Sequence, residues 1–378
     1  MPILVVGMLL VFFGVLAIYS VSIYESFALT LSLIAKGLMS GDASNYFYFL
    51  RQLRNIGIAV IMALVVYRVP IKFFQNNRNV NIIAIVILLL QLAVFIPGIG
   101  MVLNGARGWI NIPGLPSIQP AEFFKLGYII FLSNRLLRKR NFVDKKEFVI
   151  SFVVLNAITF FMFLLIPDLG TVLILGLTGL VMAWYAGLKF KKVFGIFIVG
   201  ILGGALAGGM ASMFSDRFTY IQRRFTYFIS SNVDPQSRDI GWQNEQALMA
   251  IGGGGLAGKG YGKGLQKFGF IPEAQSDFVF AAFSEEIGFL GNMVLIGLYF
   301  YLAFYFLKHL PKVRDDYPRV LGVGLISLIM IQAFINIGVN TKILPNTGLT
   351  LPFISYGGTA MMVNLIEIIL LYKIIKRK

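Results

Sequence analysis

The sequence contains ten long apolar stretches, each close to the about 20 residues that a helix needs to cross a bilayer. Because lipid cannot satisfy the hydrogen bonds of open strand edges, these stretches should be α-helices. A hydrophobic content of 57% with only 13% charged residues agrees with an all-α polytopic integral membrane protein, a single membrane domain over residues 1–378. The expected spans are 1–24, 50–69, 79–97, 119–137, 147–166, 169–188, 190–213, 278–307, 318–341 and 352–374.

The formal charge of +16 would suggest nucleic-acid binding in a soluble protein. The distribution of the positive residues distinguishes this function from the charge pattern of a membrane protein. Twenty of the 33 lysines and arginines lie on one side of the expected spans, in segments 68–78, 134–147, 188–192, 308–319 and 373–378. The short loops on the other side hold six. Cytoplasmic loops are enriched in positive residues, which predicts cytoplasmic N- and C-termini and no nucleic-acid partner. The long loop at about 214–277, before the eighth span, should then face outward.

A polar interval of glycines and lysines precedes the eighth span and ends at Asp277. Glycine has no Cβ and tolerates positive φ, so backbone N–H groups, together with Lys259 and Lys263, could approach an anion such as a phosphate closely. The alternative is an exposed loop followed by a helix that Ser276 or Asp277 only caps. With no cysteine and one histidine, the chain offers neither a disulfide nor a thiolate metal site.

Charged groups at the edge of a membrane are costly, so each is a candidate for function. Glu122 and Lys125 lie three residues apart on one helix face, where they could line a cavity or only form a structural salt bridge. Asp168 occupies a short turn, where it could cap the next helix or hold a cation. Arg107, on a short outer loop, could meet a diphosphate or only a lipid headgroup.

Glu285 and Glu286 fall inside the eighth apolar span. If one helix ran from Asp277, at most one of them would face the same cavity as Asp277, and pairing with a neighbouring helix is the alternative for both. Carboxylates can deprotonate a hydroxyl, and cations can neutralise a diphosphate. The residues alone therefore suggest a membrane enzyme or transporter that handles a lipid-linked anion at the outer leaflet.

Five motifs in order along the chain resemble the SEDS family (shape, elongation, division and sporulation), which includes FtsW and RodA. The motifs occupy residues 104–111 with 117–125, 167–171, 250–260, 272–280 with 285–288, and 344–358. Gln266-Lys267 and the sequence Gly-Leu-Thr-Leu-Pro at residues 348–352 favour the division branch, FtsW. The resemblance implies a multi-pass protein of the bacterial inner membrane, an inverting glycosyltransferase that polymerises lipid II into peptidoglycan for cell division or cell shape.

Carried over by position, Asp277 matches an aspartate essential for polymerisation, and we expect it to be the general base. Glu122, Lys125 and Asp168 match polar positions of the family's cavity, and Ser355 lies in its C-terminal signature loop. The resemblance also implies partners: a class B penicillin-binding protein, which is a transpeptidase, and other division or elongation proteins. Mg²⁺ or Mn²⁺ could assist, with Asp277 or Asp168 as candidate ligands, and no organic cofactor is expected.

Two positions depart from the family pattern. Gln275-Ser276 stands where His-Thr is common, and Gly108 stands where a second arginine is frequent. An imidazole beside Asp277 is therefore absent, and a paired-arginine clamp around Arg107 is in doubt. Two other functions stay open: a lipid II flippase, and a non-catalytic division scaffold whose partner performs the polymerisation.

Overall fold

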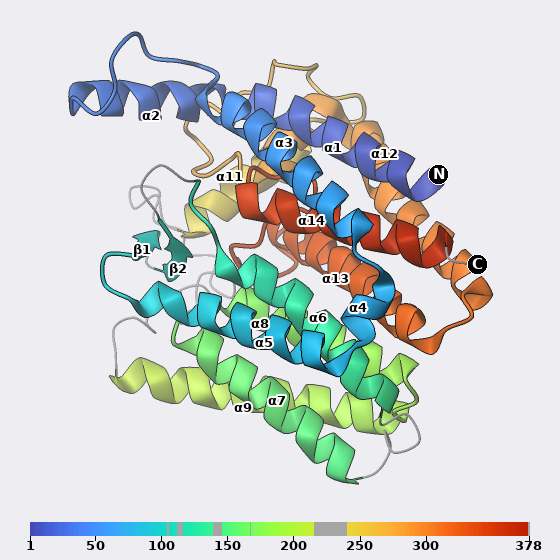
Figure 1. The fold of residues 1–378 in the computed structure, drawn as a ribbon. Helices are drawn as coiled ribbons and strands as arrows, with labels where there is room; N and C mark the ends of the chain where they lie inside the picture. The colour runs from blue at the N-terminus through green and yellow to red at the C-terminus, as the bar shows by residue number, and fades with distance from the viewer. Residues whose placement is uncertain (104–105, 112–115, 139–145, 167, 215–239, 377–378) are drawn as a thin grey trace. The chain divides into compact units, whose positions relative to one another are not determined.

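The computed structural model describes residues 1–103, 106–111, 116–138, 146–166, 168–214 and 240–376 (Figure 1). A helix lies at each of the ten expected spans, which confirms the helical membrane fold class. In the described residues, seven of the helices are long and apolar enough to cross a membrane, and α6 (Pro120–Arg138), α8 (Leu169–Tyr185) and α9 (Phe190–Phe214) are outside this set. Ten spans and their orientation stay predictions. The ten helices are α1 (Pro2–Val21), α3 (Phe47–Arg68), α5 (Asn77–Leu92), α6 (Pro120–Arg138), α7 (Lys146–Leu164), α8 (Leu169–Tyr185), α9 (Phe190–Phe214), α12 (Val279–His309), α13 (Asp316–Asn340) and α14 (Gly358–Lys376).

Local signals explain where several helices begin. Pro2 and Pro120 occupy the first position of α1 and α6, where the missing N–H costs nothing and the fixed φ already suits a helix. The side chain of Asn76 accepts from the N–H of Arg78 at 2.9 Å and so caps α5. These starts follow from residue types that can be seen in the sequence.

Several shorter elements connect the long helices. The hairpin pairs its strands antiparallel, with Gly100 opposite Ile110 and Met101 opposite Trp109. A Cβ on Gly100 would lie 1.8 Å from the carbonyl oxygen of Val94, so only glycine lets this strand pack on the turn before it. Sequence analysis predicted neither the hairpin nor α11. The shorter elements are α2 (Ile23–Ala35), α4 (Ile71–Gln75), η1 (Ala93–Phe95), β1 (Gly100–Leu103), β2 (Ala106–Ile110), α11 (Ile240–Gly253) and η4 (Leu310–Lys312).

The chain forms two compact units. In the first, α1 comes so close to the C-terminal loop that a Cβ on Gly14 would lie 2.3 Å from the carbonyl oxygen of Phe353. In the second, α5 packs on α6, and α8 contacts α6, α7 and α9. The first unit comprises Met1–Met62, Arg224–Tyr305 and Gln332–Leu365, and the second comprises Ala63–Arg223, Phe306–Ile331 and Ile366–Lys378. The single domain expected from the sequence stays a prediction.

The expected outer loop at about 214–277 is only partly described, because residues 215–239 lie outside the described residues. The described part holds α11, a glycine-rich segment and the turn that contains Asp277. The helix that follows, α12, is interrupted at Gly288, whose φ of 66° and ψ of −170° are not helical. This interruption shapes the surroundings of both glutamates predicted from the sequence.

Candidate functional site

The glycine loop, residues 254–269, packs its backbone against the interruption in α12. The N–H of Lys259 donates to the carbonyl of Glu285 at 2.9 Å, and the N–H of Phe289 donates to the carbonyl of Gly255 at 2.9 Å. A Cβ on Gly258 would lie 2.1 Å from the carbonyl oxygen of Glu286. These glycines therefore allow two backbones to meet, which is a structural use of the motif.

Both glutamates of α12 are buried and directed into the glycine loop. The Glu285 carboxylate accepts from Lys259 Nζ at 2.6 Å and from the N–H groups of Leu265 and Gln266 at 2.9 Å each. The helix α12 begins at Val279, two residues after Asp277, and both glutamates lie in its helical part before Gly288. Both carboxylates contact the glycine loop. That at most one of them faces a cavity with Asp277 stays a prediction.

Glu286 belongs to a network whose charged side chains are buried. Its carboxylate accepts from Lys267 Nζ at 2.7 Å, from Ser20 Oγ at 2.7 Å and from the N–H of Gly262 at 2.9 Å. The Lys267 and Glu286 side chains are 1% and 0% exposed. No motif predicted a contact between residues as distant in the sequence as Ser20 and Glu286. The lysine charges at 259 and 267 thus meet carboxylates within the fold, whereas Lys263 is exposed.

The Asp277 turn, residues 273–278, is held by side chains of α13. The carbonyl of Asp277 accepts from Asn336 Nδ2 and from Asn340 Nδ2, both at 2.9 Å. Asn340 Oδ1 accepts from the N–H of Ala281 at 3.0 Å, so α13 also caps the first turn of α12. The Asp277 residue itself is partly exposed. The backbone of Asp277 is therefore fixed, while the residue keeps partial exposure.

The signature loop, residues 355–358, holds the same turn from a second direction. Ser355 Oγ donates to the carbonyl of Ser276 at 2.6 Å, and the N–H of Tyr356 donates to the carbonyl of Gln275 at 2.8 Å. Ser355, predicted from the sequence, thus contacts the residue next to Asp277. Asn336 and Asn340 were missed, although two amides one helical turn apart in an apolar span are a visible signal.

The remaining predicted residues lie in the second unit. Lys125 Nζ and Glu122 Oε1 are 2.9 Å apart, and both side chains are buried. Asp168 caps α8, with Oδ1 accepting from the N–H of Thr171 at 3.0 Å and Oδ2 accepting from Thr171 Oγ1 at 2.7 Å. Arg107 is exposed on β2. Glu122 and Lys125 form a salt bridge and Asp168 caps a helix, which are the structural alternatives expected from the sequence. A single cavity that holds all of these residues together with Asp277 stays a prediction.

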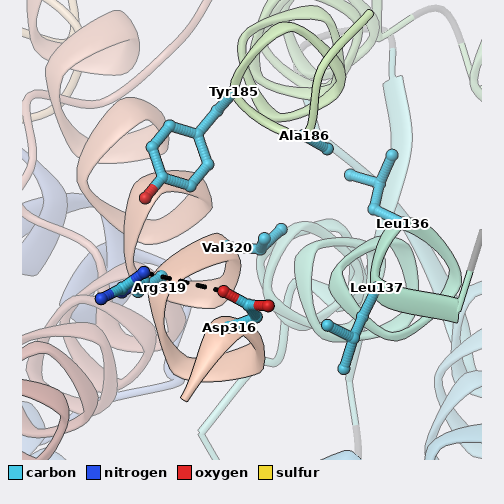
Figure 2. A pocket seen from close by; sticks show the side chains of 7 residues that line it. All are labelled: Leu136, Leu137, Tyr185, Ala186, Asp316, Arg319 and Val320. Carbon is cyan, nitrogen blue, oxygen red and sulfur yellow. Dashed lines mark ion pairs between the residues drawn. The ribbon is translucent and has the colours of Figure 1, made fainter. Parts of the chain in front are cut away.

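Figure 2 shows a separate cavity of about 200 Å³ in the second unit. It lies where α6 and α8 end and α13 begins, which are helix ends predicted to face the cytoplasm. Arg319 approaches Asp316 at 3.7 Å and donates to the carbonyl of Val313 at 2.5 Å. No residue predicted from the sequence lines it, so it is not the candidate site. Its lining residues are Leu136, Leu137, Tyr185, Ala186, Asp316, Arg319 and Val320.

A divalent cation needs several oxygen ligands that converge on one point. In the part of the chain that the structure describes, no three His, Cys, Asp or Glu side chains converge as a set of metal ligands. Asp168 uses both carboxylate oxygens in its cap. A divalent cation held by Asp277 or Asp168 therefore stays a prediction.

Comparisons with known proteins place these features in a family. The family model described as "Cell cycle protein", named for FtsW, RodA and SpoVE, matches residues 1–378. The chain is 37% identical over 327 residues to stage V sporulation protein E of Bacillus subtilis strain 168, which covers 86% of each chain. It is 32% identical over 380 residues to the probable peptidoglycan glycosyltransferase FtsW of Geobacter metallireducens, covering 99% of this chain and 94% of the relative.

Solved structures share the fold. RodA of Thermus thermophilus aligns with a TM-score of 0.68 at 22% identity, covering 99% of this chain and 95% of RodA. A chain from a peptidoglycan synthase complex that coordinates polymerization and crosslinking aligns with a TM-score of 0.76 at 22% identity, covering 99% and 96%. Since the relatives include SpoVE as well as FtsW, the preference for the FtsW branch stays a prediction. The chain belongs to the SEDS family of multi-pass inner-membrane proteins, the family of FtsW, RodA and SpoVE.

Proposed function

We propose that this chain is a peptidoglycan glycosyltransferase that polymerises lipid II into glycan strands at the outer face of the inner membrane. Relatives that share a third of its sequence over most of their length are named peptidoglycan glycosyltransferases. The observation that carries the proposal is the Asp277 turn. Two asparagines and the signature loop hold its backbone, while Asp277 remains partly exposed.

In this mechanism the Asp277 carboxylate removes the proton from the sugar 4-hydroxyl of an incoming lipid II. The resulting oxygen nucleophile attacks the anomeric carbon of the lipid-linked growing chain, and the bond from that carbon to the diphosphate breaks with inversion. The prenyl diphosphate leaves with the bonding electrons, and its charge is met by cationic side chains. Asn336 and Asn340 fix the Asp277 carbonyl, which limits the positions that the carboxylate can take.

The partner in this proposal is a class B penicillin-binding protein that crosslinks the strands. Support comes from the structural neighbour, a peptidoglycan synthase complex in which polymerization and crosslinking are coordinated. A flippase for lipid II is the second candidate function. The buried Glu122–Lys125 pair in α6 favours it, because charges inside a membrane protein often mark the path of a charged cargo.

The test is incubation of the purified chain with lipid II, with and without the cognate transpeptidase, in buffer with Mg²⁺ or Mn²⁺, followed by gel separation of the glycan products. We expect glycan strands from the wild type and a loss of about 10²–10⁴-fold in rate for Asp277→Asn, since general bases typically contribute that much. Asp42→Asn, which removes the same charge from an exposed loop residue, is the matched control.

A wild type that makes no glycan in any arm would remove the glycosyltransferase proposal. An Asp277→Asn variant with the wild-type rate would remove the general base alone. Proteoliposomes with labelled lipid II separate the second candidate, because a flippase would move label between leaflets without synthesis. Normal growth of cells that carry only the Asp277→Asn variant would favour the scaffold.

A further inference from the structure

The proposed reaction releases a diphosphate, and its negative charge has to be met by cations near Asp277. In the first unit, Lys259 and Lys267 already form ion pairs with Glu285 and Glu286. Lys259 and Lys267 are therefore poor candidates for the cations that receive the leaving group, whereas the exposed Lys263 stays a candidate. Other positive side chains of the same unit have to be considered.

Two arginines at the start of α3 have the required properties. Arg51 and Arg54 are both exposed and lie three residues apart, so they share one flank of the helix. Within the described part of the chain, neither forms an ion pair with a carboxylate. Sequence analysis places this end of α3 at the outer edge of the membrane. Two cations are thus available on the side where the diphosphate would leave.

The adjoining side of α3, on which Gln52 is buried, contacts the signature loop. The rings of Tyr48 and Tyr356 meet edge to face with their centroids 4.9 Å apart. One turn further, Gln52 Nε2 donates to the carbonyl of Ser355 at 3.4 Å. Since Ser355 and Tyr356 also bind the backbone of the Asp277 turn, a chain of direct contacts links α3 to the proposed base.

The positive charge of the two arginines acts on Tyr356. Burial raises the pKa of its hydroxyl, while the positive charges of Arg51 and Arg54 both lower the pKa. Both guanidinium groups therefore act on one point of the signature loop. The Arg51 guanidinium also stacks on the Phe47 ring, 4.1 Å from its centroid. Stacking restrains the plane of the guanidinium and leaves its N–H edges for an oxyanion.

We propose that Arg51 and Arg54, together with the Tyr356 hydroxyl, form a binding subsite for the diphosphate of a prenyl-diphosphate-linked sugar, beside the Asp277 turn. The planar forks of two arginines can bind phosphate oxygens bidentately, which a single lysine cannot do. This inference rests on the proposed function, because the reaction at Asp277 supplies the leaving diphosphate.

The experiment measures binding to the purified full-length chain in nanodiscs made of zwitterionic lipid. The probes are farnesyl diphosphate, farnesol and inorganic pyrophosphate, and the variants are Arg51→Gln, Arg54→Gln and the double variant. Each single variant should bind farnesyl diphosphate about ten- to a hundredfold more weakly, the range expected for a lost hydrogen bond to a charged group. Farnesol binding should not change, and pyrophosphate binding should weaken in the same variants.

Arg68→Gln is the matched control, since Arg68 is an exposed arginine in the last turn of the same helix. It should leave the affinity for farnesyl diphosphate unchanged. Lysine replacements at positions 51 and 54 keep the charge and give a second measurement if a glutamine variant fails to fold; they should weaken binding several-fold. A double variant that binds like the wild type, or an equal loss in Arg68→Gln, would overturn the subsite.

A competition arm distinguishes the source of the phosphate. Nanodiscs that contain phosphatidylglycerol should compete only weakly with farnesyl diphosphate, and full competition would make this a general anionic-lipid contact and overturn the proposal. Binding needs no turnover, so a wild type that makes no glycan refutes the proposed function while the subsite is still measured. Normal glycan synthesis with unchanged binding in the double variant refutes only the subsite.

Discussion

The glycine loop and the Asp277 turn are neighbours in the sequence, but they use their polar groups in opposite ways. In the glycine loop, Lys259 and Lys267 reach buried carboxylates. In the Asp277 turn, the contacts fall on the backbone, since Asn336, Asn340 and Ser355 all donate to carbonyl oxygens of that turn. The charged side chains of the glycine loop stabilise the fold, and the contacts of the Asp277 turn hold one side chain in place.

The glycine and lysine run is conspicuous in the sequence, but its role here is structural. A run of glycines with lysines predicts a phosphate cradle, yet here Gly258 and Gly288 allow two backbones to touch. The arginines of α3 belong to no recognised motif, because they are isolated positive residues at the start of an apolar span. A positive residue becomes a strong candidate for ligand binding only after its carboxylate partners are known.

The largest effect should come from breaking the buried pair under the glycine loop. Lys267→Met leaves Glu286 buried without its cation, and the free energy of unfolding should fall by about 3–5 kcal/mol. Denaturant unfolding in detergent micelles measures this change. Adding Glu286→Gln should restore part of the loss, because the uncompensated charge is gone. Lys263→Met is the control at an exposed lysine, and an equal loss there would contradict the structural role of Lys267.

Two glycines of the loop allow a matched test of backbone contact. Gly258 and Gly262 have the same φ of 79°, but only Gly258 has an atom within reach of a Cβ, at 2.1 Å. Gly262→Ala should cost about 1–2 kcal/mol for the left-handed backbone alone. Gly258→Ala adds overpacking and should cost about 2–5 kcal/mol in total. Equal unfolding free energies for the two variants would show that the loop does not press on α12.

Substitutions at the side chains that hold the Asp277 turn should lower the rate of polymerisation more than the stability of the protein. Asn340→Asp keeps an acceptor for the N–H of Ala281 but removes a donor to the Asp277 carbonyl. We expect kcat for lipid II polymerisation to fall about tenfold with KM unchanged, the pattern of an interaction made in the transition state. Asn134→Asp is the control, because Asn134 also donates to a backbone carbonyl, that of Gln75 at 2.8 Å. A loss of kcat of the same size in both variants would leave Asn340 with a general structural role.

The sequence predicted the helices well for a physical reason. A span of about 20 apolar residues needs no partner to be recognised, since the bilayer sets its length. Asp277 and Ser355 were found through motifs, and the structure joins them through the carbonyl of Ser276. What could not be predicted depends on contacts across the chain, such as Ser20 with Glu286, which are 266 residues apart.

Some features that were not predicted can nevertheless be recognised in the sequence. Gln332, Asn336 and Asn340 recur every four residues, so they form one polar stripe on the otherwise apolar α13. Such a stripe inside a membrane span predicts a buried polar contact. Gly288 likewise stands two residues after Glu286 and could have indicated an interruption of the helix. The arginines of α3 gave no comparable signal, because only the fold brings them to the signature loop.

The smallest effect concerns a carboxylate beside the Asp277 turn. Burial raises the pKa of Glu25 above its ordinary value of 4.5, and the charge of Glu273 raises it further. At pH 4 most Glu25 side chains are protonated in both the folded and the unfolded chain, so Glu25→Gln should unfold nearly like the wild type. As pH rises, the unfolded chain ionises first and the wild type loses stability until pH passes the raised value of the folded state.

Glu25→Gln should therefore be more stable than the wild type at pH 8, by less than about 1 kcal/mol because the site is half exposed. Unfolding free energies at pH 4 and pH 8 measure the difference, with the exposed Asp42→Asn as control. Glu273→Gln should reduce the gap, since it removes the second negative charge. A wild type that gains stability over Glu25→Gln between pH 4 and pH 8 would mean that a cation faces Glu25. The Asp277 turn would then be bordered by positive charge on this side as well as beside the arginines of α3.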